Sequence, residues 1–99
     1  MRTLLKINIP VQAGSRAVRD GTLAETVKTV FSQITPEAAY FSADGGVRSI
    51  HAVFDLADPT EICPTLEPFF TDLDANCELV PCMNQEELEA GMAKLFGRA

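Results

Sequence analysis

The sequence is poor in several residue types on which common protein chemistries depend. Its 99 residues include no tryptophan, one tyrosine, one histidine and three cysteines, namely Cys63, Cys77 and Cys82. No two cysteines form a Cys-x-x-Cys pair, and one histidine cannot complete the four-ligand set of a zinc site. We therefore expect no structural metal. An odd number of cysteines cannot pair fully within one chain, so reduced thiols in a cytoplasmic protein are predicted.

Positive charge is scarce and unevenly distributed. Eight basic residues stand against fourteen acidic ones, which gives a net charge of −6. No Lys or Arg lies between Arg48 and Lys94, whereas ten acidic residues do. A nucleic-acid partner requires a basic surface that displaces counterions from phosphates, and an anionic membrane surface makes the same demand. The composition excludes both partners, and the acidity is interpreted as an aid to solubility.

Long apolar runs are also missing. No run approaches the roughly 18 residues that a membrane-spanning helix needs, and the first residues lack the basic-then-apolar layout of a signal peptide. We expect a single domain over residues 1–99 that is neither exported nor embedded in a membrane. A chain of this length buries about 60–65% of its unfolded surface. Association with a second copy would therefore favour its stability.

Alternating apolar residues predict four strands, over 3–11, 38–42, 47–56 and 77–83. Asp44-Gly45 lies between the second and third of these and predicts a two-residue hairpin loop. That loop would place Tyr40 opposite Ser49 and diagonal to His51, all on one face. Pro81 within the last strand favours an edge position, because proline cannot donate to a strand partner.

Apolar residues at helical spacing predict three helices. The first begins at Thr22, where Glu25 three residues later indicates a capping box. Pro36 ends it and favours extended backbone at Thr35. A second helix opens at Asp58-Pro59, with an N-cap acceptor and a proline at the first helical position. A third runs from Asn84 to Gly97.

The segment 12–21 is polar and contains two glycines and two arginines, and it is interpreted as a loop. The resulting order, β-α-β-β-α-β-α, is the split βαβ or ferredoxin-like arrangement, an α+β fold with a four-stranded antiparallel sheet and an added C-terminal helix. Right-handed crossovers place the first and third strands at the centre. Two helices then cover one face of the sheet. The terminal helix could cover the other face in its own chain or in a partner.

The opposite face of the predicted sheet is too polar for a core and too apolar for a plain solvated surface. An exposed patch of this kind marks an association surface. We therefore expect a homodimer through the open sheet face, in a barrel-like assembly with a partly polar interior. The side chains predicted to lie there are Leu4, Lys6, Asn8, Tyr40, Ser49, His51, Val53, Glu78 and Val80.

Three stretches carry a resemblance to a known superfamily. They are Asp58-Pro59 at the start of a helix, residues 69–73 (FFTDL), and residues 78–81 (ELVP) followed by an acidic helix. The chain resembles the dimeric α/β-barrel superfamily, and in particular its small bacterial families without an assigned function. The superfamily also includes cofactor-independent monooxygenases, muconolactone-type isomerases and haem enzymes. The resemblance implies a dimer and a pocket without selecting a reaction.

Four residues are the candidates for a functional site. Histidine is the residue type best suited to proton transfer near neutral pH, and His51 is expected to lie diagonal to Tyr40, so the two are predicted as a proton-transfer pair. Arg16 and Arg19 are predicted to hold an anionic group of a substrate by bidentate hydrogen bonds. The competing interpretation is a histidine within a dimer interface and two solvated arginines. No nucleotide loop follows Gly14, and no cofactor is expected.

Three functions remain open on these grounds. The first is a homodimeric small-ligand-binding or accessory module. The second is a cofactor-independent monooxygenase or isomerase that acts on a small, anionic organic substrate through His51 and Tyr40. The third is a structural partner in a larger assembly.

Overall fold

The computed structural model of the chain describes residues 1–97 and shows an α+β, ferredoxin-like fold with one four-stranded sheet. The helical turns at Asp44–Gly46 and Pro59–Glu61 are of the 3₁₀ type. In chain order the strands and α-helices are β1 (Arg2–Ile9), α1 (Val11–Asp20), α2 (Thr22–Ile34), β2 (Ala38–Ser42), β3 (Arg48–Asp55), α3 (Ile62–Leu73), β4 (Asn76–Pro81) and α4 (Gln85–Phe96).

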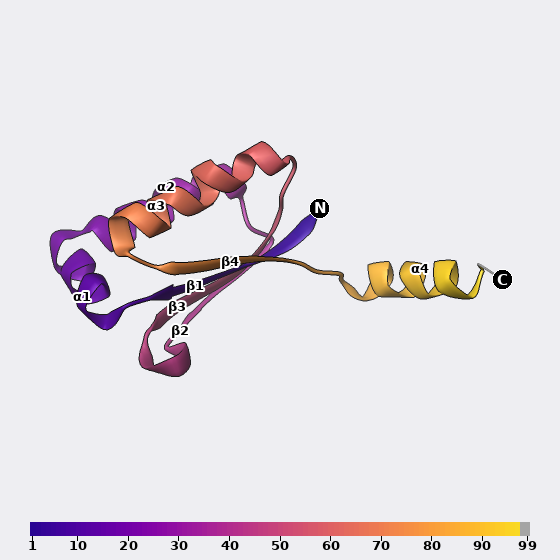
Figure 1. Cartoon of the computed structure of the whole chain (residues 1–99), viewed down its shortest axis with the longest axis horizontal. Coiled ribbons are helices and arrows are strands. Elements are labelled where there is room, and N and C mark those ends of the chain that lie inside the picture. The colour runs from indigo at the N-terminus through magenta and orange to yellow at the C-terminus, as the bar shows by residue number, and fades with distance from the viewer. Residues whose placement is uncertain (98–99) are drawn as a thin grey trace.

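The sheet has the strand order β2-β3-β1-β4, and every neighbouring pair is antiparallel. This confirms the prediction that the first and third strands are central. Pro81 is the last residue of the edge strand β4, where its missing N–H costs no ladder bond. Helices α2 and α3 lie side by side on one face of the sheet (Figure 1).

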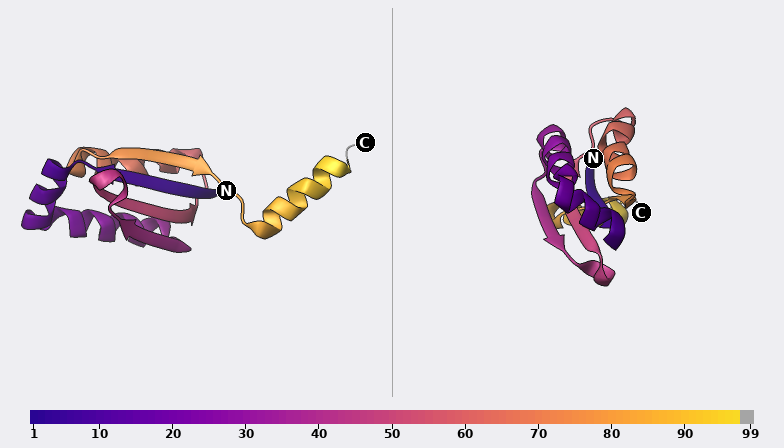
Figure 2. Two further views of the ribbon diagram at one scale, coloured as in Figure 1. Left: turned by 90° about the horizontal axis from the view of Figure 1, so that it is seen from below. Right: turned by 90° about the vertical axis from the view of Figure 1, so that its left-hand side faces the viewer.

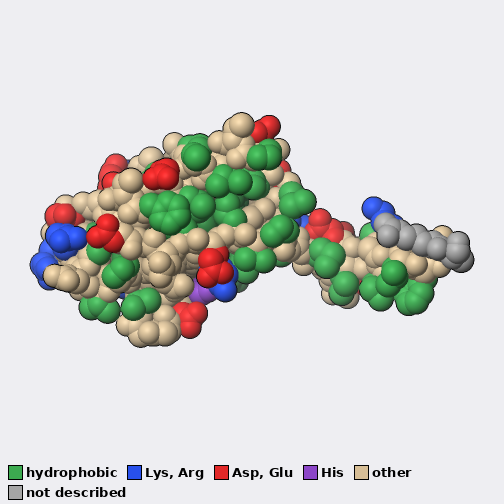
Figure 3. Space-filling view, viewed as in Figure 1, with side chains coloured by type: hydrophobic (Ala, Val, Ile, Leu, Met, Phe, Trp, Pro, Cys, Tyr) green, Lys and Arg blue, Asp and Glu red, His purple; other side chains and the backbone are tan. Residues whose placement is uncertain are grey.

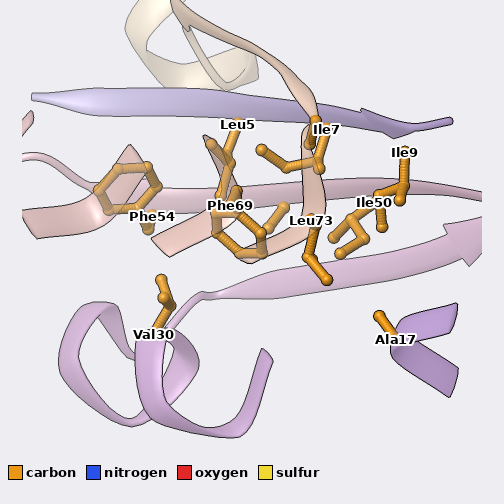
Figure 4. Packing of buried hydrophobic residues seen from close by; sticks show 11 residues of the cluster. Leu5, Ile7, Ile9, Ala17, Val30, Ile50, Phe54, Phe69 and Leu73 are labelled. Carbon is orange, nitrogen blue, oxygen red and sulfur yellow. The ribbon is translucent and has the colours of Figure 1, made fainter. Parts of the chain in front are cut away.

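The core lies between this covered face and the helices. Every second residue of β1 is buried there, and Phe69 and Leu73 of α3 are fully buried against them. Figure 4 shows Leu5, Phe69 and Leu73 gathered between the strands and α2. The buried cluster is apolar throughout and comprises Leu5, Ile7, Ile9, Ala17, Val30, Ile50, Ala52, Phe54, Phe69, Leu73 and Ala75.

The prediction of a loop over 12–21 is wrong, because Val11–Asp20 form helix α1. Its buried residues are Ala13, Gly14 and Ala17. Small residues one turn apart allow the helix to approach its neighbours closely, but they leave no stripe of large apolar side chains in the sequence. The fold therefore has four α-helices where three were expected.

The predicted capping box at the start of α2 is also wrong. Thr22 is the first residue of the helix, and the capping position belongs to Gly21, whose φ of 83° is left-handed. A side chain at Gly21 would be strained in this conformation, so glycine permits the sharp junction between α1 and α2. Asp20 instead accepts a hydrogen bond from the Thr22 backbone N–H at 2.8 Å.

Two turns differ from the expected geometry. The β2–β3 connection pairs Ser42 with Ser49, so its loop is longer than two residues and Tyr40 lies directly opposite His51. The register has moved by two residues, which keeps all three predicted side chains on one face. Thr35 is left-handed, with a φ of 45°, rather than extended; its N–H donates to the Phe31 carbonyl and closes α2.

The predicted capping residues of the last two helices are confirmed, but Asp58-Pro59 open a 3₁₀ turn, and the α-helix α3 begins only at Ile62. Asp58 Oδ1 accepts a hydrogen bond from the Thr60 N–H at 2.8 Å. Asn84 and Glu87 form a reciprocal capping box at the start of α4. These short polar side chains satisfy backbone donors that have no partner within the helix.

Helix α4 projects away from the sheet and its helices (Figures 1 and 2). An ion pair between Arg2 and Glu87 joins its first turn to β1. Its apolar side chains gather along one side (Figure 3), and they are 42 to 77% exposed: Leu88, Met92, Leu95 and Phe96. The sequence analysis left open whether the terminal helix covers its own sheet or that of a partner. Because α4 projects away from the sheet, the first alternative is wrong.

Candidate functional site

The open face of the sheet is the face away from α2 and α3. Strand register aligns its side chains in three rows that each cross all four strands. The apolar row is Ala38, Val53, Leu4 and Val80; the titratable row is Tyr40, His51, Lys6 and Glu78; the hydroxyl and amide row is Ser42, Ser49, Asn8 and Asn76. Within residues 1–97, no helix lies over these rows (Figure 2).

The titratable row brings together the two predicted catalytic residues. Tyr40 and His51 are direct cross-strand partners, and His51 is in turn opposite Lys6. Direct partners have Cβ atoms about 4.5–5.5 Å apart. His51 is half-buried and Tyr40 is exposed. A phenol, an imidazole and an ammonium group therefore line one continuous strip, with the Glu78 carboxylate at its end.

Hydrogen bonds hold the two central side chains of the hydroxyl and amide row, Ser49 and Asn8. Ser49 is 2% exposed, and its Oγ lies 2.9 Å from Asn8 Oδ1, to which it donates. The Val47 carbonyl is also 2.9 Å from that hydroxyl. These contacts connect β1, β3 and the end of the β2–β3 loop. The row therefore forms a polar border along one side of the titratable row.

The two predicted arginines lie elsewhere. Arg16 and Arg19 belong to α1, which contacts α2 and α3 at one end of the sheet (Figure 1). Arg16 Nη2 is 3.9 Å from Asp74 Oδ2, and both side chains are exposed. The structure thus joins His51 with Tyr40 and places the arginines on the helical layer, away from the open face.

The structure also has a cleft that the sequence analysis did not predict. An open cleft of about 410 Å³ runs between α2 and the β2–β3 edge of the sheet on the covered side. Its sequence signal is Phe41, which alternation assigns to the covered face although it is 62% exposed. The lining residues are Ile9, Leu23, Ala24, Val27, Lys28, Phe41, Ser42, Arg48, Ser49 and Ile50.

The cysteines do not form a reactive centre. Burial, together with the nearby Glu67 carboxylate, raises the pKa of Cys77 to about 11, which suppresses its thiolate. All three cysteines are free thiols. In the described part of the chain, no three His, Cys, Asp or Glu side chains gather as metal ligands. Nor is any helix of residues 1–97 long and apolar enough to cross a membrane.

No protein-family model matches the chain, and no curated protein matches it. The fold is therefore established by the structure, and the likeness to the dimeric α/β-barrel superfamily stays a prediction from the sequence.

Proposed function

We propose that the chain is a homodimeric small-ligand-binding module whose two open sheet faces pack together. The observation that carries this proposal is the apolar row, which crosses a four-stranded face that no helix of residues 1–97 covers. Contiguous apolar surface on a small domain favours association. A two-fold axis needs only one self-complementary patch, so a single row serves both copies.

The charges of the face are compatible with burial in such a dimer. Lys6 and Glu78 are direct cross-strand partners and carry opposite charges. Removing charged groups from water is costly unless they are paired and hydrogen-bonded. The register places a carboxylate residue directly opposite each Lys6, so an ion pair within one chain or across the interface would meet this requirement. The neighbouring His51 and Tyr40 then offer hydrogen-bonding groups to a small polar ligand between the faces.

Sedimentation equilibrium at micromolar concentration tests the assembly. We expect about twice the chain mass for the unmodified protein and the single-chain mass for Val80→Asp, which places a carboxylate in the apolar row. Ile62→Asp is the matched control, because Ile62 is 37% exposed on α3 and Val80 is 39% exposed on the open face. A monomeric unmodified protein, or equal effects of both substitutions, would overturn the proposal.

A second candidate function, a cofactor-independent monooxygenase or isomerase, is favoured by the direct pairing of His51 with Tyr40. An imidazole beside a phenol can accept a proton from a substrate carbon while the phenol donates to the developing oxyanion. This candidate predicts turnover of small carbonyl or phenolic acids that is lost in His51→Gln and reduced in Tyr40→Phe. Binding of such compounds without turnover would support the module instead.

A further inference from the structure

We propose that the cleft between α2 and the β2–β3 edge binds a small organic acid with an apolar body. This site is on the opposite side of the sheet from the titratable row, so it does not depend on the proposed dimer. Ligand sites for small molecules occupy about 300–1,000 Å³ and combine apolar walls with a few charged or polar groups. The cleft, at about 410 Å³, has this size and this composition.

The apolar lining comes from four elements. Leu23 and Val27 contribute from α2, Ile9 from β1 and Ile50 from β3. Phe41 of β2 completes the rim, and its ring packs against Phe31 with centroids 5.9 Å apart. An aromatic side chain that is 62% exposed beside a hollow gains buried surface when an apolar group enters. The walls therefore favour an aliphatic or aromatic body over a polar one.

The positive charge that lines the cleft indicates which polar group the ligand carries. Arg48 and Lys28 both line it, and no Asp or Glu does. Within residues 1–97, neither cation has a carboxylate within 4.0 Å; the same is true of Lys6, Arg19 and Lys94, but none of these lines the cleft. Two unpaired cations beside one apolar hollow are notable in a chain of net charge −6. A carboxylate placed there gains charge-assisted hydrogen bonds, and the guanidinium can bind both of its oxygens.

The position of Arg48 is set by α1. Arg48 Nη1 donates to Ser15 Oγ at 3.3 Å, which leaves other N–H groups of the guanidinium for a ligand. Gly14 provides the space for this arrangement, because a Cβ built there would lie 3.0 Å from Arg48 Nη1 and 3.4 Å from its Cδ. Gly14 is therefore a positioning residue. Its replacement by alanine would displace the guanidinium without removing the charge.

Titration of the full chain with octanoate and with octanol, followed by amide chemical shifts, tests the site. We expect octanoate to produce saturable shifts around Val27, Phe41, Arg48 and Ile50. Octanol, which has the same apolar chain and no charge, should bind at least about tenfold more weakly, because that ratio corresponds to one modest charge-assisted contact. Equal binding of the two probes, or no saturable shift in the cleft, would overturn the proposal.

Charge variants separate the contribution of the cleft from general electrostatics. Arg48→Gln and Lys28→Gln should each weaken octanoate binding several-fold and leave octanol binding unchanged. Lys28 is exposed on α2, so its variant tests the site even where Arg48→Gln impairs folding. Lys94→Gln on α4 removes the same charge far from the cleft and should have no effect. If it weakens octanoate binding as much as the cleft variants do, the attraction is non-specific and the proposal fails.

Two further outcomes would also reject the site. Octanoate shifts confined to Lys6 and His51 would assign the anion to the open face. Shifts in the cleft that depend on protein concentration without any probe would assign the cleft to a second copy of the chain. Gly14→Ala supplies a further test of geometry: it should weaken octanoate binding more than octanol binding, because the added Cβ would lie 3.0 Å from Arg48 Nη1 as well as 3.2 Å from the apolar wall at Ile9 Cγ2.

Discussion

The two faces of the sheet are made by alternate residues of the same strands, yet they differ in burial and in polarity. On β1, Leu5 is fully buried beneath α2 and α3, while the adjacent Leu4 is half-buried on the open face. The covered face is apolar over its centre, with Thr3 and Arg48 toward its two ends, whereas the open face is divided into apolar, titratable and hydroxyl rows. The covered face therefore forms the core, whereas the side chains of the open face change from apolar at one end to polar at the other.

The largest expected effect compares the two leucines. Leu5→Ala should lower the free energy of unfolding by about 2–5 kcal/mol, because it leaves a cavity in the packed core. Leu4→Ala should cost less than half as much at concentrations where the chain is monomeric. Urea unfolding of both variants measures the difference. Equal losses would mean that the open face is as tightly packed as the core, and the comparison would fail.

The reactivities of Cys77 on β4 and Cys63 on α3 also distinguish the covered side of the sheet from the exposed surface. Cys77 is directed toward the covered side, and its pKa of about 11 lowers its thiolate fraction at pH 8 about 100-fold relative to a thiol at the usual 9.0. We expect iodoacetamide to modify the exposed Cys63 long before Cys77, as followed by peptide mass spectrometry. In denaturing urea all three rates should converge. A native Cys77 that reacts as fast as Cys63 would contradict its placement.

The smallest effect is expected at helix starts, away from either face. Backbone hydrogen bonds from Thr60 lower the pKa of Asp58, and the side chain and backbone of Thr22 lower that of Asp20. Folding thus favours the ionised carboxylates. Their contribution is complete above the ordinary value of 3.8 and is lost as the pH falls through the lowered pKa values.

Thermal unfolding midpoints between about pH 6 and pH 2 measure this loss, and they should fall with acidification. Asp58→Asn is the informative variant, because its amide oxygen still caps the helix and does not titrate. Its acid-induced decrease should be shallower than that of the unmodified chain. An identical slope would show that Asp58 contributes nothing to the pH dependence.

Much of the fold was predictable because its strands alternate clearly and its helices carry large apolar stripes. Leu5, Ile7 and Ile9 identified the covered face, and Pro81 identified an edge strand. Helix α1 was missed because its buried side is made of small residues, Ala13, Gly14 and Ala17, and such a side looks like a loop in a hydropathy pattern.

The candidate site was predictable only in part. Alternation put Tyr40 and His51 on one face, but the Asp44-Gly45 signal gave the wrong hairpin length, so their direct pairing was missed. The cleft depends on how far α2 extends across β2, and no local pattern encodes that distance. Arg48 lines the cleft and donates to Ser15 of α1, and this contact was hidden by the error over residues 12–21.

The outward projection of α4 increases the hydrodynamic size of a single copy of this protein. The molecule measures 57 × 28 × 17 Å, and its radius of gyration is 15.9 Å, against about 13 Å for a compact chain of similar length. Such a shape experiences extra hydrodynamic drag, so a single copy should elute early from a sizing column and mimic a heavier particle. The molar mass should therefore be measured by a method that does not depend on molecular shape, such as sedimentation equilibrium.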